Sequence, residues 1–348
     1  MANLSFSQKI TTWFLSHQRN LPWRHTTDPY FIWLSEVILQ QTRVAQGMPY
    51  YLKFTENYPT VYDLAAAPEQ EVIRLWQGLG YYSRARNLHQ TAQFIVENLS
   101  GQFPNSYNNL LTLKGIGPYT AAAIASFAYN EPVAVVDGNV FRVLARVFGI
   151  ETDIASNEGK KQFTALANKL LDKNQPAAFN QSIMEFGAIQ CQPISPDCLL
   201  CPLRDDCVAR LTGQISVLPV KEKKIKIRER FFDYLVFKFQ NKIALRQRTQ
   251  RDIWQQLFDF QLIESTDSLI ESLDDIQLNI NPKTIIISAP TQVFSHILTH
   301  QRIKAQFWQI EIQQANDLPA GLTFYSESEF DDLPKPVLIT KYWKTVIS

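Results

Sequence analysis

All four cysteines of the chain fall in one short window, as Cys191, Cys198, Cys201 and Cys207 with the spacing C-x6-C-x2-C-x5-C. Ligands of one metal centre must converge on a point, so this clustering predicts a single metal site. Two disulfides are an alternative, but they are typical of small secreted chains that lack a core. Four thiolates also suit a tetrahedral Zn²⁺, which more often uses two C-x2-C-like pairs. A [4Fe–4S] cluster accommodates wider loops, so the spacing favours iron–sulfur.

Length and charge limit the possible classes. The 348 residues suggest two domains, and 45% hydrophobic residues are enough for two cores. No apolar run approaches the roughly 20 residues that span a bilayer, and the N-terminus has no signal-like core, so we expect a cytoplasmic protein without membrane contact. The net charge is only +1. Any DNA binding must therefore depend on local dipoles and a few placed cations.

The sequence pattern changes once along the chain, from helical to strand-like. Residues 1–216 show helical apolar spacing between Pro and Gly breaks, which predicts an all-α region that includes the cysteine loop at 191–207. Residues 217–230 carry a dense run of cations and predict a basic linker, with contact to a DNA backbone as the alternative. Residues 231–348 predict a smaller α+β domain. In it we expect strands at 231–239, 242–246, 284–288 and 306–312, and a helix at 266–276.

Two stretches of the helical region carry candidate chemistry. Lys114-Gly115-Ile116-Gly117 opens an alanine-rich helix, and a glycine turn at a helix N-terminus can bind phosphate through its free amides. An ordinary turn between helices is the alternative. Asp137 follows an apolar run where another helix begins. An N-cap is its simplest interpretation, and a cap can also be a catalyst.

Together, Leu-x-Gly-Ile-Gly-x-x-Thr-Ala, the downstream Asp137 and the cysteine spacing resemble the helix-hairpin-helix DNA glycosylase superfamily. The resemblance implies a helical module whose hairpin (Lys114, Gly115, Gly117) holds DNA phosphate, a catalytic aspartate and a [4Fe–4S] loop. Bifunctional members such as endonuclease III have a lysine before the threonine, which forms a Schiff base. Tyr119 stands there in this chain. A phenol cannot form an imine, so we expect a monofunctional enzyme that uses water.

Three N-terminal motifs narrow the resemblance to the adenine DNA glycosylase (MutY-type) family. They are Leu21-Pro22-Trp23-Arg24, the stretch from Trp33 to Thr42, and the stretch from Gly78 to Leu88. That family removes adenine mispaired with 8-oxoguanine in duplex DNA, and we expect the same activity on A:8-oxoG and A:G mispairs, from a monomer. A thymine or uracil mismatch glycosylase of the same superfamily is one alternative. A non-catalytic DNA-damage binder is another.

Glu36 has two interpretations. On a helical wheel it lies away from the most apolar stripe, which favours a solvated glutamate balanced by Arg43. The resemblance instead implies the catalytic acid, which protonates adenine at N7 so that a neutral base departs. Asp137 would stay ionised beneath the oxocarbenium-like sugar, with Asn139 and Tyr119 placing it and the water.

The target base must leave the duplex before it is cleaved. The resemblance implies that Gln41 and Tyr81 are inserted beside the orphan base, although core packing is an alternative for Tyr81. Arg24 is also expected to contact DNA. Arg84 and Arg86 either add charge to the same surface or are ordinary surface arginines.

The C-terminal region resembles the family's Nudix-like reader domain. Its clearest match is Phe294-Ser295-His296, where the resemblance implies that Ser295 approaches 8-oxoguanine. His296 and His300 could instead form a metal pair, but no third ligand is evident. The carboxylate-rich box of Nudix hydrolases is absent from the sequence around residues 254–263. We therefore expect this domain to recognise a base, not to hydrolyse a nucleotide.

Overall fold

The computed structural model describes residues 4–222, 227–272 and 285–347. Its chain divides into two compact units, residues 1–66 with 90–223 and residues 67–89 with 224–348. The domain boundaries expected from the sequence remain predictions. No helix among the described residues is long and apolar enough to cross a membrane.

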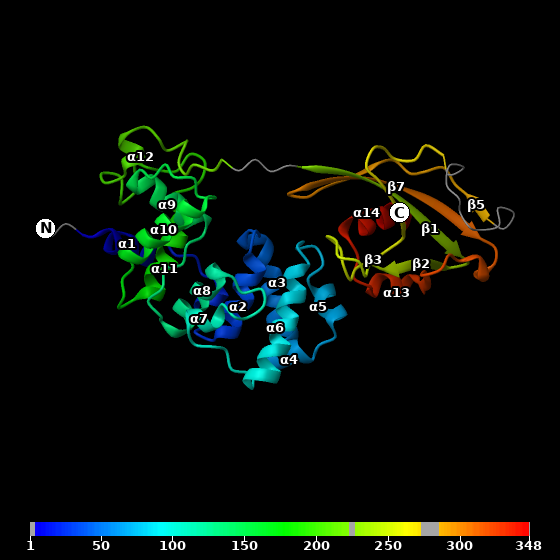
Figure 1. Ribbon diagram of the computed structural model, residues 1–348, viewed down its shortest axis with the longest axis horizontal. Helices are drawn as coiled ribbons and strands as arrows, with labels where there is room; N and C mark the ends of the chain where they lie inside the picture. Colours follow the sequence, from blue (N-terminus) through cyan, green and yellow to red (C-terminus); the bar gives the residue numbers. More distant parts are fainter. Residues whose placement is uncertain (1–3, 223–226, 273–284, 348) are drawn as a thin grey trace. The chain divides into compact units, whose positions relative to one another are not determined.

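The first unit is helical, which confirms the expected secondary structure of the N-terminal region (Figure 1). Its helices are α1 (Phe6–His17), α2 (Pro29–Leu39), α3 (Val44–Asn57), α4 (Val61–Ala66), α7 (Tyr107–Leu110), α8 (Pro118–Tyr129), α9 (Gly138–Phe148), α10 (Asn157–Leu170), α11 (Pro176–Glu185) and α12 (Val208–Leu211). A 3₁₀ turn spans Pro22–Arg24, and a π-helical turn, Phe186–Gln190, continues α11. Helix α6 (Ser83–Leu99) begins in the second unit and ends in the first.

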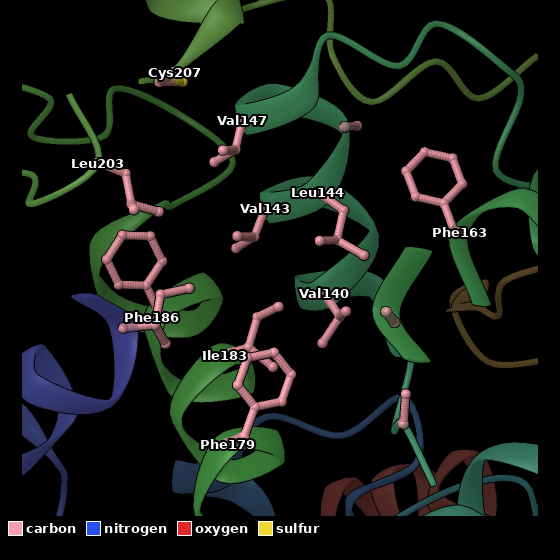
Figure 2. Packing of buried hydrophobic residues seen from close by; sticks show 14 of the residues in the cluster. Val140, Val143, Leu144, Val147, Phe163, Phe179, Ile183, Phe186, Leu203 and Cys207 are labelled. Carbon is pink, nitrogen blue, oxygen red and sulfur yellow. The ribbon is translucent and has the colours of Figure 1, made fainter. Parts of the chain in front are cut away.

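Helix α9 runs through the core of the first unit. Its apolar side chains, spaced three and four apart, share one stripe and are fully or nearly fully buried. Figure 2 shows Val140, Val143, Leu144 and Val147 of this stripe facing side chains from α10, α11 and the cysteine segment. The packing fixes α9 along its whole length, so the residues at its N-terminus are held firmly.

Among the described residues, the second unit contains an eight-stranded sheet. Its strands are β1 (Arg228–Phe239), β2 (Lys242–Gln247), β3 (Phe258–Asp259), β4 (Gln261–Ser265), β5 (Ile285–Ile287), β6 (Phe294–Ile297), β7 (Gln301–Ile312) and β8 (Thr323–Ser326). The order is β3-β2-β1-β7-β5, with β4 on β1, β6 on β7 and β8 on β2. Only β1 and β7 pair in parallel among the described strands.

Three helices accompany the sheet: α5 (Glu69–Leu75), α13 (Glu327–Asp332) and α14 (Val337–Ile347). Helix α14 packs on the sheet through Tyr342, whose ring stacks on Phe307 of β7 with centroids 3.9 Å apart. An α+β domain is therefore present where the sequence predicted it.

One local expectation for this unit is wrong. Residues 266–272 form bends where a helix was expected, and 273–276 lie outside the described residues. The buried carboxylate of Asp233 accepts a hydrogen bond from the amide of Ile270, which a helix over these residues would use within its own backbone. Strand β1 begins at Arg228, inside the expected linker. Arg230 is buried there and pairs with Asp252 and Glu264.

Candidate active site

Glu36 lies in the middle of α2, a helix that Asp28 caps and Pro29 opens. Every residue from Ile32 to Ile38 is buried, and Glu36 is only 7% exposed. The interpretation as a solvated glutamate is therefore wrong. The helical wheel predicted exposure for the less apolar stripe of α2, but this helix is covered on several sides, so that stripe is also buried.

The environment of Glu36 favours its protonated form. Burial raises its pKa to about 7, a hydrogen bond with Tyr119 lowers it in part, and the charge of Asp137 raises it further. Burial also holds the pKa of Tyr119 well above its ordinary value, so the phenol stays a hydrogen-bond donor. A carboxyl group titrating near neutral pH, beside a neutral phenol, is suited to proton transfer.

Asp137 is the N-cap of α9. Its Oδ1 accepts the amide of Val140 at 2.8 Å, and its Oδ2 accepts Nδ2 of Asn139 at 2.7 Å. Burial raises the pKa of Asp137 above its ordinary value, and these hydrogen bonds and the charge of Arg142 offset that rise only in part. Glu36, Tyr119, Asp137 and Asn139, predicted from separate motifs, thus come together in one site.

Arg142 connects this site to the cysteine segment. Its Nη2 donates to Oδ1 of Asn139 at 2.9 Å and to the carbonyl of Gly187 at 2.6 Å, and its Nε donates to the carbonyl of Cys191 at 2.7 Å. The π-helical turn brings Gly187 so close that a Cβ there would lie 2.6 Å from Cβ of Asn139. Arg142 is a site residue that was not predicted from the sequence, although its position one helical turn after Asn139 indicates that the two side chains share a face.

A cavity of about 50 Å³ opens beside Glu36. Half of its lining residues are apolar or aromatic and half are polar or charged: Trp23, Ile32, Phe127 and Met184, with Arg24, Ser35, Glu36 and Gln181. Trp23 and Phe127 offer rings for stacking and the polar residues offer hydrogen bonds, but about 50 Å³ is well below the roughly 300 Å³ of a ligand pocket, so a base can enter only if this cavity widens.

The guanidinium of Arg24 is fixed in this wall. Both of its terminal nitrogens donate to the buried Glu185, at 3.1 and 2.7 Å. Glu185 also accepts three hydrogen bonds from Arg19. Burial raises the pKa of Glu185, but the bonds from Arg19 and Arg24 outweigh it and lower the pKa to about 2. Glu185 gave no signal in the sequence, because its partners are far away in the chain.

The four cysteines line one apolar cavity of about 20 Å³ and carry free thiols. Burial, and then the proximity of the other cysteines, raises the pKa of Cys201 to about 11. Arg146 lies 3.6 Å from Sγ of Cys191. No three His, Cys, Asp or Glu side chains within the described ranges meet the geometry of a closed metal site. The donor set itself, four thiols around one cavity with an adjacent cation, fits a thiolate-ligated cluster.

The glycine turn before α8 presents an open helix N-terminus. Gly115 has φ +75°, a left-handed conformation that favours glycine. Gly117 is the N-cap of α8, and no side chain caps the first turn. Lys114, Gly115 and Gly117 are exposed. The turn therefore has the form of an anion site.

The remaining candidates lie on exposed backbone. Gln41 and Tyr81 both have left-handed φ values, +54° and +48°, and both side chains are exposed. Ser295 is exposed on β6. Its neighbour His296 turns inward onto the ring of Trp254, with centroids 5.6 Å apart.

Comparisons with known proteins agree with this architecture. Residues 34–173 match the HhH-GPD superfamily of base excision DNA repair proteins, and residues 234–345 match the NUDIX domain. The chain is 34% identical over 337 residues to the adenine DNA glycosylase of Buchnera aphidicola subsp. Schizaphis graminum, covering 95% of this chain and 96% of that one. It is 43% identical over 215 residues to the human adenine DNA glycosylase, covering 59% and 39%. A solved thermostable thymine-DNA glycosylase is 31% identical, with TM-score 0.56 over 60% of this chain and 95% of that one.

Proposed function

The chain belongs to the adenine DNA glycosylase family, and we propose that it hydrolyses the N-glycosidic bond of adenine opposite 8-oxoguanine or guanine. It is a monofunctional DNA glycosylase of base excision repair that binds duplex DNA. The observation that carries the proposal is the buried Glu36, whose pKa is about 7, in contact with Tyr119 and facing Asp137. The cytoplasmic location and monomeric state expected from the sequence remain predictions.

Glu36 is the proposed general acid. At neutral pH an appreciable fraction of this carboxyl group carries a proton, and the adjacent cavity has aromatic walls for a flipped base. Protonation of adenine at N7 turns a poor anionic leaving group into a neutral one. General acid catalysis of this kind contributes roughly 10²–10⁴-fold to a rate.

Asp137 is the proposed stabiliser of the positive charge that develops on the sugar. Its oxygens accept hydrogen bonds from Val140 and Asn139, which favour the ionised form. Asn139 is itself held by Arg142, so the carboxylate stays in place as the bond breaks. No amine stands at position 119, so attack by water completes the reaction.

The DNA contacts belong to the same proposal. The open N-terminus of α8, with Lys114, Gly115 and Gly117, binds a backbone phosphate. Arg24 is positioned to contact the flipped base from the cavity wall. Gln41 and Tyr81 fill the gap that the flipped adenine leaves, and Ser295 reads the base opposite.

We also propose that Cys191, Cys198, Cys201 and Cys207 hold a [4Fe–4S] cluster. Relatives that resemble endonuclease III usually carry one, and the four free thiols line one cavity. When bound, the cluster has a structural role and does not react with the substrate. Arg146 would neutralise part of its negative charge.

The test uses duplexes bearing A:8-oxoG, A:G, T:G and U:G, followed by hot alkali, which cleaves strands at abasic sites. We expect cleavage only of the adenine strands, and no covalent adduct with borohydride. Glu36→Gln should keep DNA affinity and lose excision by at least about a hundredfold. Glu56→Gln, which neutralises an exposed carboxylate on α3, is the matched control. Release of thymine, or undiminished excision by Glu36→Gln, would refute the proposal.

A further inference from the structure

Thr299 lies in the turn that joins β6 to β7. The amide of Leu298 closes this turn by donating to the carbonyl of Gln301 at 2.8 Å. The side chain of Thr299 reaches Tyr81, and a 2.6 Å hydrogen bond joins the hydroxyl groups of these two residues. Thr299 thus stands four residues after Ser295 on one continuous strand and turn, and it contacts the residue proposed to enter the duplex.

Tyr81 is held at two further points. Its left-handed backbone follows Gly78 and Gly80, which also have positive φ, and the indole of Trp76 donates to the carbonyl of Gly80 at 3.0 Å. The guanidinium of Arg84 lies over the Tyr81 ring at 5.7 Å. A non-glycine residue in this conformation persists only where its surroundings enforce it. The ring is still 43% exposed, so it is oriented and accessible at once.

The Thr299 bond does not hold this segment in place by itself. Arg74 donates to Asp332 at 2.7 Å, Arg86 donates to the carbonyl of Gln255 at 2.9 Å, and Gln77 accepts the amide of Lys335 at 3.2 Å. These contacts are made by other side chains of the segment and not by the Tyr81 ring. Within the described residues, the hydrogen bond with Thr299 is the contact at the hydroxyl end of the Tyr81 ring.

We propose that Thr299 is a positioning residue that ties the Tyr81 ring to the strand carrying Ser295, so that insertion into the duplex and reading of the orphan base occur together. The inference rests on the proposed function. 8-Oxoguanine offers Ser295 an N7–H donor and an O8 acceptor that guanine lacks. When Ser295 engages them, β6 and its turn are fixed, and the Thr299 bond transmits that position to Tyr81. When guanine is the opposite base, Ser295 lacks these two partners, so β6 is not fixed and the Thr299 bond adds little to binding.

The experiment is a double-mutant cycle with Thr299→Val, Tyr81→Phe and both changes together. Single-turnover excision at increasing enzyme concentration gives a dissociation constant and a limiting rate for A:8-oxoG and for A:G. We expect Thr299→Val to weaken A:8-oxoG binding about three- to tenfold, the effect of one hydrogen bond, with little change for A:G and in the limiting rate. Thr299→Ser, which keeps the hydroxyl, should restore discrimination. Thr323→Val, an exposed threonine of β8, is the control.

Non-additivity is the decisive result. If the two hydroxyls act through one bond, the double variant is no weaker on A:8-oxoG than the weaker single variant. Additive losses, or wild-type discrimination in Thr299→Val, would overturn the proposal while leaving adenine excision intact. A wild-type protein that releases no adenine from either duplex would instead overturn the proposed function, and this inference with it.

Discussion

Replacing Glu36 by glutamine should stabilise the first unit and abolish excision. In the folded protein the pKa of Glu36 is raised from its ordinary value of 4.5 to about 7, so the folded state binds more protons than the unfolded state between those values. Stability conferred by the protonated group is therefore lost as pH rises through this window. The full loss corresponds to about 3 kcal/mol. Glutamine is neutral at every pH, so the Glu36→Gln variant does not lose this stability as pH rises.

The measurement is the thermal midpoint of the wild type and Glu36→Gln at several values between pH 4.5 and 8. The two midpoints should nearly coincide at pH 4.5, and the variant should melt higher by about 6–12 °C at pH 8, since 1 kcal/mol shifts a unit of this size by about 2–4 °C. Glu56→Gln, on the surface of α3, should show no such divergence. A difference between wild type and Glu36→Gln that does not change with pH would refute the argument, because it would mean that burial does not perturb this carboxyl group.

Three further outcomes follow from the same site. The single-turnover rate should fall as pH rises through about 7, because the acid must be protonated, and Tyr119→Phe should move that limb to higher pH by removing the bond that lowers the pKa of Glu36. Asp137→Asn should keep the midpoint within about 2 °C, because asparagine caps helices as well as aspartate does, yet lower the excision rate by at least about a hundredfold. Glu185→Gln should lower the free energy of unfolding at pH 7 by about 3 kcal/mol, since it leaves Arg24 without its buried counter-ion. Denaturant titration at pH 7 and pH 3 checks this, and the difference between wild type and variant should be smaller at pH 3, because the stability from ionised Glu185 is lost as pH falls from 4.5 toward 2.

Local patterns predicted the elements and several site residues. Helical spacing, Pro and Gly breaks and the cysteine window gave the helical region, the sheet domain and the ligand candidates. Motif resemblance brought together Glu36, Tyr119, Asp137 and Asn139, which meet in the folded chain. These signals depend on neighbours within a few residues, and that is the range in which a single sequence is informative.

The failures come from contacts that are distant in the chain. A wheel projection of α2 cannot show that α8 covers the side where Glu36 lies. The segment near 270 has helical composition, but the carboxylate of Asp233 accepts the amide of Ile270, which a helix would bond within its own backbone. Arg230 ends a run that looks solvated, yet it is buried against acids from later in the chain. In each case a buried polar group is paired with a residue that is distant in the sequence, and this pairing, not local propensity, determines the local structure.

Asp137 shows why the two interpretations of a motif need not compete. A capping aspartate uses one oxygen for the helix amides, and here Oδ1 does so at Val140. Oδ2 does not bond the helix amides and is oriented by Asn139, which lies in the first turn of the same helix; it is the oxygen that the proposed reaction would use. Because α9 is locked into the core over its length, its first turn is a rigid platform. The cap thus fixes the orientation of the carboxylate, and under the proposed mechanism the same rigidity serves both helix initiation and charge stabilisation.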